Sequence, residues 1–181
     1  MNRLAISDYT VTSALGTGRV ATIAALRAGR TGLQPRAFET AALATWIGEV
    51  PGVDAGRLPP ALAEFDCRNN RLAWLGLQAD DFAGSVHAAR ARHGARRIAL
   101  VLGTSTSGIL SAEQAYRRRD PVSGALPPDF HYAGTLNTGS LATFVRAALD
   151  EQAVEMTKAG PARPSAARTK AASEPVLSVP A

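Results

Sequence analysis

Two hydrophobic patterns alternate along the first 150 residues of this chain. Short apolar runs at Arg3–Ser7 and Arg97–Leu102 predict β-strands, and the second run is continuous and branched up to Gly103. Such runs are typical of central parallel strands that are covered on both faces. Trp46–Val50 is a further candidate strand, inside a segment rich in Gly and Pro.

Between these runs, apolar residues recur at the spacing of a helix face. Strands that alternate with helices of about ten residues imply βαβ units, and therefore an α/β domain whose sheet is sandwiched between helices. A basic turn is expected at Ala88–Arg97. The predicted helices are Arg19–Ala28, with Thr17 or Gly18 as N-cap, Asn70–Ala83, Ile109–Arg118 and Asn137–Leu149.

The composition changes at Asp150. Residues 151–181 are rich in Ala, Pro, Ser and Lys, and every Phe, Trp and Tyr of the chain lies before them. We therefore expect a domain over residues 1–150 and a tail over residues 151–181. Three explanations of the tail stay open: a shifted reading frame or a wrongly assigned gene end, a disordered extension, and a divergent strand at Pro175–Val179.

Charge and cysteine content exclude several classes of function. The net charge of +5 comes from scattered Arg and Lys without an aromatic-interleaved basic patch, so we do not expect nucleic-acid binding. A single cysteine excludes a disulfide framework and a Cys-based zinc cluster. No apolar run approaches the ~20 residues that span a bilayer. We expect a cytoplasmic protein without a membrane segment and without a cofactor.

The loop Gly103–Gly108 is the first candidate for chemistry. It follows a predicted strand and opens a predicted helix, where backbone N–H groups converge and where ligands bind in open sheets. Its sequence matches neither the P-loop nor the dinucleotide fingerprint. The alternative is a tight turn that lets the helix pack closely on the sheet.

Single polar residues give weaker signals. Cys67 precedes a predicted helix and lies beside Arg68, which would lower a thiol pKa, but a lone cysteine is more often a small buried hydrophobe. We expect His87 and His93 to be solvated and His131 to pack in a loop. The adjacent Asp80 and Asp81 would point to different sides of a helix and so are not expected to act as an acid/base pair.

Several segments together resemble the β-ketoacyl-[acyl-carrier-protein] synthase family. Each motif is short, but they follow one another in the family's order over residues 3–150. Tyr9 or Thr10 stands where the family often has Gly. The segments that carry the resemblance are Val11–Gly16, Leu26–Leu33, Asp66–Leu72, Ile98–Gly108 and Leu136–Ala142.

The resemblance implies the N-terminal half of a thiolase-like layered α/β fold. That family extends acyl chains by decarboxylative Claisen condensation with malonyl-acyl carrier protein, using a Cys nucleophile in a Thr-Ala-Cys motif and two His. The Cys motif would follow the helix that ends near Leu149, and no Cys follows here. Cys67 lies on an earlier helix, so no catalytic residue can be carried over. Thr104, Ser105, Thr106, Ser107, Gly108 and Ile109 match the loop that lines the acyl pocket, and Phe130 matches an aromatic that reaches the partner's pocket, although loop packing explains Phe130 equally well.

The function expected from the resemblance is that of a truncated β-ketoacyl synthase of fatty-acid or polyketide-type biosynthesis, inactive alone. Its implied partner is acyl carrier protein, with a homodimer or pairing with a full-length synthase as the assembly. Two alternatives stay open: a non-catalytic ketosynthase-like partner subunit, and an unrelated small-molecule-binding α/β domain that uses Gly103–Gly108.

Overall fold

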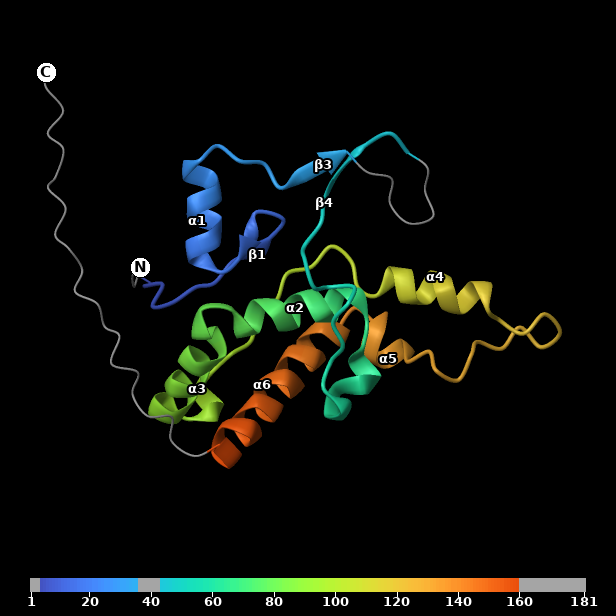
Figure 1. The fold of residues 1–181 in the computed structure, drawn as a ribbon. Helices are drawn as coiled ribbons and strands as arrows, with labels where there is room; N and C mark the ends of the chain where they lie inside the picture. The colour runs from blue at the N-terminus through green and yellow to red at the C-terminus, as the bar shows by residue number, and fades with distance from the viewer. Residues whose placement is uncertain (1–3, 36–42, 160–181) are drawn as a thin grey trace, which may run out of the picture.

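The computed structural model describes residues 4–35 and 43–159 of the 181-residue chain (Figure 1). This part is a mixed α/β structure in which helices predominate. The α-helices are α1 (Arg19–Arg27), α2 (Arg68–Gln78), α3 (Phe82–His93), α4 (Ile109–Arg117), α5 (Tyr132–Thr135) and α6 (Ser140–Ala159). Short 3₁₀ turns are η1 (Pro60–Phe65), η2 (Ala79–Asp81) and η3 (Ala95–Arg97).

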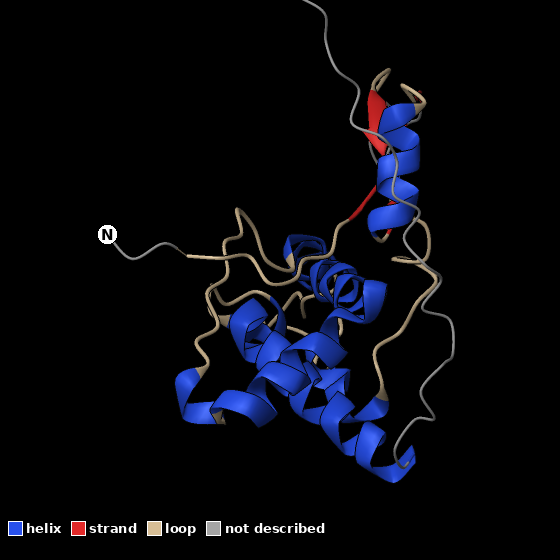
Figure 2. Cartoon of the chain, turned by 90° about the vertical axis from the view of Figure 1, so that its left-hand side faces the viewer, coloured by secondary structure: helices blue, strands red, loops and turns tan. Residues whose placement is uncertain are grey.

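The strands form two small antiparallel ribbons. β1 (Thr12–Ser13) pairs with β2 (Gly16–Thr17), and β3 (Leu33–Pro35) pairs with β4 (Trp46–Gly48) with Gln34 opposite Ile47. Figures 1 and 2 show these strands gathered away from α3 and α6. The strand expected at Trp46–Val50 is thus confirmed over its first three residues.

The predicted parallel sheet is wrong for the described part of the chain. Residues 4–7 and 98–102 form no strand, and Leu4, Ile6 and Val101 are almost fully exposed. A continuous apolar run becomes a central strand only where neighbouring strands pair with both its edges. Neither run has such neighbours among the described residues, so their apolar pattern alone does not produce a sheet.

The hydrophobic core lies where α6 packs on α2 and η1. Phe144 of α6 is fully buried, and its ring centroid lies 5.9 Å from that of Phe65, with the two planes tilted by 52°. A tilted aromatic pair stabilises a core beyond the area that it buries. The other buried members of this cluster are Leu58, Leu62, Leu77, Val145 and Ala148.

The helix predicted at Asn70–Ala83 is two helices separated by a kink. Asp80 and Asp81 have φ of 57° and 56°, a left-handed conformation that Asp tolerates better than most residues. The Asp80 carboxylate accepts hydrogen bonds from the Arg19 backbone N–H at 2.9 Å and from the Thr10 hydroxyl at 2.9 Å. Gly18, the N-cap of α1, offers no side-chain acceptor, so Asp80 takes this role from across the fold.

Two helices extend further than the sequence predicts. The basic turn expected at Ala88–Arg97 is wrong as far as His93, because α3 continues through Ala and Arg, both good helix formers, and ends at Gly94. Helix α6 begins at Ser140 and runs through Asp150 to Ala159, ten residues past the predicted end. The compositional change at Asp150 is therefore not a helix end. The strand predicted at Pro175–Val179 lies outside the described residues.

Within the described residues, no helix combines the length and the apolar character that a bilayer crossing requires.

Candidate functional site

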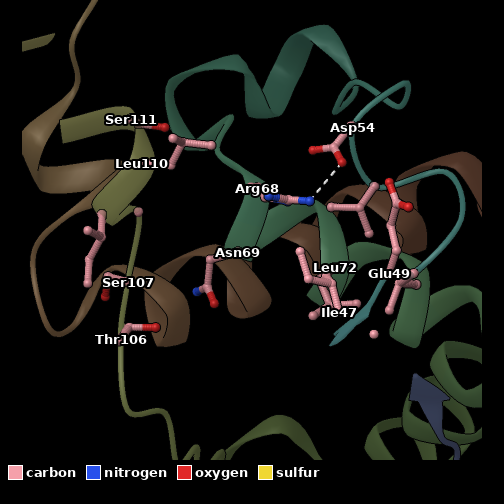
Figure 3. Close-up of a pocket in the computed structure, with 15 residues that line it drawn as sticks. Ile47, Glu49, Asp54, Arg68, Asn69, Leu72, Thr106, Ser107, Leu110 and Ser111 are labelled. Atoms are coloured by element: carbon pink, nitrogen blue, oxygen red, sulfur yellow. Dashed lines mark hydrogen bonds and ion pairs between the residues drawn. The ribbon is translucent and has the colours of Figure 1, made fainter. Parts of the chain in front are cut away.

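A cavity of about 560 Å³ lies where the start of α2 faces the start of α4 (Figure 3). One wall is β4 with the turn that follows it, including Ile47, Val50 and Asp54. The opposite wall is the loop that precedes α4 and the first turn of that helix. Three segments that are distant in sequence thus meet at one place.

The loop that was singled out from the sequence forms part of this cavity. Residues 106–109 line it, whereas Thr104 and Ser105 do not. The backbone N–H of Gly108 donates to the Thr135 carbonyl oxygen at 2.8 Å, and the Ser107 hydroxyl donates to the Asn137 carbonyl oxygen at 3.3 Å. These bonds fix the loop to the last residue of α5 and to the segment that follows it.

Gly108 is needed here because of a close approach between two chain segments. Its φ of −71° is open to any residue, but a Cβ atom at this position would lie 2.9 Å from the Thr135 carbonyl oxygen. We expect Gly108→Ala to lower the free energy of unfolding by about 1–3 kcal/mol, because the added methyl group pushes the loop away from α5. Urea unfolding followed by circular dichroism measures this change.

Gly103→Ala is the matched control for Gly108→Ala. A Cβ atom at Gly103 would meet nothing within 4 Å, and this residue has no positive φ. Its free energy of unfolding should therefore change by less than about 0.5 kcal/mol. Equal losses in the two variants would show that the Gly108–Thr135 approach is unimportant.

Two polar cavity residues on α2, Arg68 and Asn69, were not predicted as site residues. The Arg68 guanidinium donates to an Asp54 carboxylate oxygen at 2.8 Å, and both side chains are partly exposed. Asn69 lies next to Arg68, and its buried Nδ2 has no hydrogen-bond partner in the described part of the chain. Figure 3 shows Asn69 on the side of the cavity where Thr106 and Ser107 lie. A buried, unpaired amide donor can bind a ligand carbonyl or hydroxyl oxygen.

The cavity combines apolar and polar surfaces. The apolar lining consists of Ile47, Val50, Leu72 and Leu110. The polar lining includes the amide of Asn69 and the hydroxyls of Thr106 and Ser107. No Cys or His lines it. This lining suits the binding of a ligand with an apolar chain and a polar group, and it supplies no nucleophile and no imidazole base.

Cys67 is buried outside the cavity. Its side chain is 1% exposed at the N-cap of α2, and burial raises the pKa of its thiol above the ordinary value, against the opposing effects of the Asn70 and Asn69 backbone N–H groups. A thiol with a raised pKa stays protonated at neutral pH. The interpretation of Cys67 as a small buried hydrophobe is confirmed.

The remaining residues with candidate chemistry lie apart from the cavity. His87 is half-buried and its Nε2 lies 2.8 Å from the Leu149 carbonyl oxygen, so the prediction of a solvated side chain is wrong for His87 and holds for His93, which is exposed. His131 is exposed in the loop before α5. Phe130 is half-buried and does not line the cavity. The described residues contain no group of three or more His, Cys, Asp or Glu that could hold a metal ion.

No family model matches the chain, and searches of the curated proteins and of the solved structures found no match. The assignment of function therefore depends on the lining of the cavity, on the burial of Cys67 and on the resemblance of the sequence motifs to the β-ketoacyl synthase family.

Proposed function

We propose that this chain is the N-terminal portion of a β-ketoacyl-[acyl-carrier-protein] synthase of fatty-acid or polyketide-type biosynthesis, and that it does not catalyse condensation alone. The observation that carries the proposal is the cavity beside Thr106–Ile109, the loop that the resemblance assigns to the acyl pocket. The finer fold assignment, the N-terminal half of a thiolase-like domain, belongs to the same proposal.

The lining of the cavity supports an acyl ligand. An alkyl chain would contact Ile47, Val50 and Leu72, which are the apolar side chains of one wall and of α2. The unpaired Nδ2 of Asn69 would donate to a carbonyl oxygen of the same ligand. An acyl thioester carries both groups.

The absence of activity follows from the position of the one thiol. A condensing enzyme needs a thiolate at a helix N-terminus that faces the acyl pocket. Cys67 is at the N-terminus of α2, but it is buried away from the cavity and its pKa is raised. It therefore cannot receive an acyl group in the folded chain.

The partner we propose is acyl carrier protein, with a homodimer or a full-length synthase as the assembly. With a single, free cysteine, the chain suits the reducing cytoplasm. A second candidate is a small-molecule-binding domain without acyl specificity, which the unpaired amide of Asn69 also favours.

The test of the proposal is an assay with acyl- and malonyl-acyl carrier protein. We expect no β-ketoacyl product and no acyl adduct on Cys67 by mass spectrometry. Iodoacetamide should leave Cys67 unmodified in the folded chain at neutral pH and modify it in denaturant, because burial and the raised pKa both protect the thiol.

Cys67→Ala is the control for this assay. Turnover in the unaltered chain that disappears in Cys67→Ala would contradict the proposal. Reading the genomic DNA after codon 150 in the other frames tests the family separately, since a frame that encodes a Thr-Ala-Cys motif would support it. Binding of many unrelated small molecules, with no preference for acyl thioesters, would favour the second candidate.

A further inference from the structure

A second cavity, a cleft of about 590 Å³, lies between α3 and α6, and the segment that follows α3 forms its third wall. Helices α3 and α6 lie side by side at the end of the molecule remote from β3 and β4 (Figure 1). The volume is within the range of about 300–1,000 Å³ that small-molecule sites occupy. The cleft shares no lining residue with the cavity beside α2 and α4, so it is a separate place on the molecule.

Much of the cleft is lined by apolar side chains that the chain itself leaves uncovered. Ile98 and Leu100 of the third wall are 40% and 44% exposed. Transfer of such apolar surface out of water is favourable, so an apolar group of a ligand gains free energy by covering it. The apolar lining residues are Val86, Ala95, Ile98, Leu100, Ala142 and Leu149.

The charged lining of the cleft is two arginines and one carboxylate. Arg90 of α3 donates to the Asp150 carboxylate of α6 at 2.6 Å, so these two charges neutralise each other. Arg146 lies one helical turn before Asp150, and its guanidinium makes no hydrogen bond or ion pair with the residues that the structure describes. A guanidinium presents its N–H donors in a planar fork that matches a carboxylate. Arg146 is therefore a cation at the cleft that is left for a ligand.

The sign of the charge distinguishes this cleft from the cavity beside α2 and α4. In that cavity Arg68 is accompanied by two carboxylates, Asp54 and Glu49. Its lining thus carries an excess of negative charge and repels an anion, whereas the lining of the cleft carries an excess of positive charge and attracts one.

We propose that the cleft between α3 and α6 binds an amphipathic carboxylate, a small molecule with one carboxylate group and an apolar chain or ring. Arg146 binds the carboxylate, and Ile98 and Leu100 cover the apolar part. The inference does not rest on the function proposed above, because it uses no residue of the cavity beside α4.

The first test is isothermal titration calorimetry of the full chain with decanoate, below the concentration at which decanoate forms micelles. We expect one molecule of decanoate to bind per chain. Decyltrimethylammonium has the same alkyl chain with a positive head group, and it should bind at least about tenfold more weakly because Arg146 repels it.

Arg146→Gln tests the cation. This variant should bind decanoate at least about fivefold more weakly, since a charge-assisted hydrogen bond to the carboxylate is lost. Arg92→Gln is the matched control, because Arg92 is an exposed arginine of α3 that does not line the cleft. Its affinity for decanoate should equal that of the unaltered chain.

Asp150→Asn gives a change of opposite sign. Removal of this carboxylate eliminates a like charge beside the ligand and releases Arg90, so decanoate should bind about two- to fivefold more tightly. Asp129→Asn is the matched control, since Asp129 is also an exposed carboxylate in an ion pair, with Arg118 at 2.9 Å, and does not line the cleft. A purely structural role of Asp150 predicts no gain of affinity.

Leu100→Glu tests the apolar wall and Leu102→Glu is its control. The two leucines lie in the same segment and are 44% and 40% exposed, but only Leu100 lines the cleft. Leu100→Glu should abolish decanoate binding, and Leu102→Glu should preserve it. Far-UV circular dichroism shows whether each variant is folded.

Four results would overturn the proposal. One is the absence of decanoate binding, and another is equal binding of decanoate and decyltrimethylammonium. The third is an affinity for decanoate that Arg146→Gln and Leu100→Glu leave unchanged in folded chains. The fourth is binding that survives these two changes but is lost in Asn69→Ala, which would assign decanoate to the cavity beside α4 and so concern the proposed function instead.

Discussion

Replacement of Phe144 by Ala is expected to lower the free energy of unfolding by about 3–5 kcal/mol. Phe144 is 0% exposed and lies in the centre of the cluster that joins α6 to α2 and η1. Its removal abolishes the aromatic contact with Phe65 and leaves a cavity that the surrounding helices fill only in part. Since small domains are stable by only about 5–15 kcal/mol, a large part of the variant should be unfolded at moderate temperature.

Tyr116→Ala is the control for Phe144→Ala. Tyr116 is also an aromatic residue of a helix, α4, but it is 56% exposed. Its replacement should change the free energy of unfolding by less than about 0.5 kcal/mol. Urea denaturation followed by far-UV circular dichroism measures both variants. A loss for Phe144→Ala no larger than that for Tyr116→Ala would show that α6 is not packed on this core.

Replacement of Gly134 by Ala is expected to be the other strongly destabilising change, by about 3 kcal/mol. Gly134 is buried in α5, and a Cβ atom there would collide with the Glu64 carbonyl oxygen of η1. The two segments must separate to accommodate the methyl group. The Gly134 carbonyl also accepts a hydrogen bond from the buried Asn70 side chain at 3.2 Å, and this bond would be strained by the same movement.

Gly76→Ala tests whether the effect at Gly134 is steric. Gly76 lies inside α2, where a Cβ atom would meet nothing within 4 Å. Alanine has the higher helix propensity, so this variant should gain about 0.5–1 kcal/mol. Thermal or urea unfolding should thus move in opposite directions for the two Gly→Ala changes. A loss of stability in both would contradict the close approach of α5 and η1.

Sequence patterns predicted the helices better than the strands. The predicted spans of α1 and α4 agree with the structure to within one residue at their ends, because apolar periodicity and a following glycine or basic residue mark a helix locally. The apolar run Ile98–Leu102 indicates burial, but a sheet also needs neighbouring strands, which no local pattern supplies. Asp80, at the kink, accepts hydrogen bonds from Thr10 and Arg19, about seventy and sixty residues away in the sequence. The spacing of apolar residues within the helix therefore cannot predict this kink.

The sequence predicted only one wall of the cavity, the loop that precedes α4. The small-residue loop up to Gly108 was identified from its place between an apolar run and a helix, and residues 106–109 do line the cavity. Asn69 was missed because an amide at the start of a helix resembles any solvated polar residue. The signal is its buried, unpaired Nδ2, which is a property of the folded structure and has no local sequence pattern.

The contact between Asp80 and α1 has a consequence for the order in which the chain becomes structured. The acceptor for the first free N–H of α1 lies 61 residues further along the chain. Closing a loop of that length costs conformational entropy, so the first turn of α1 gains its cap only after the α2–α3 kink has formed. The N-terminal ribbon and helix therefore belong to one cooperative unit with the middle of the chain, and a fragment that ends before α2 would contain an α1 with a frayed start.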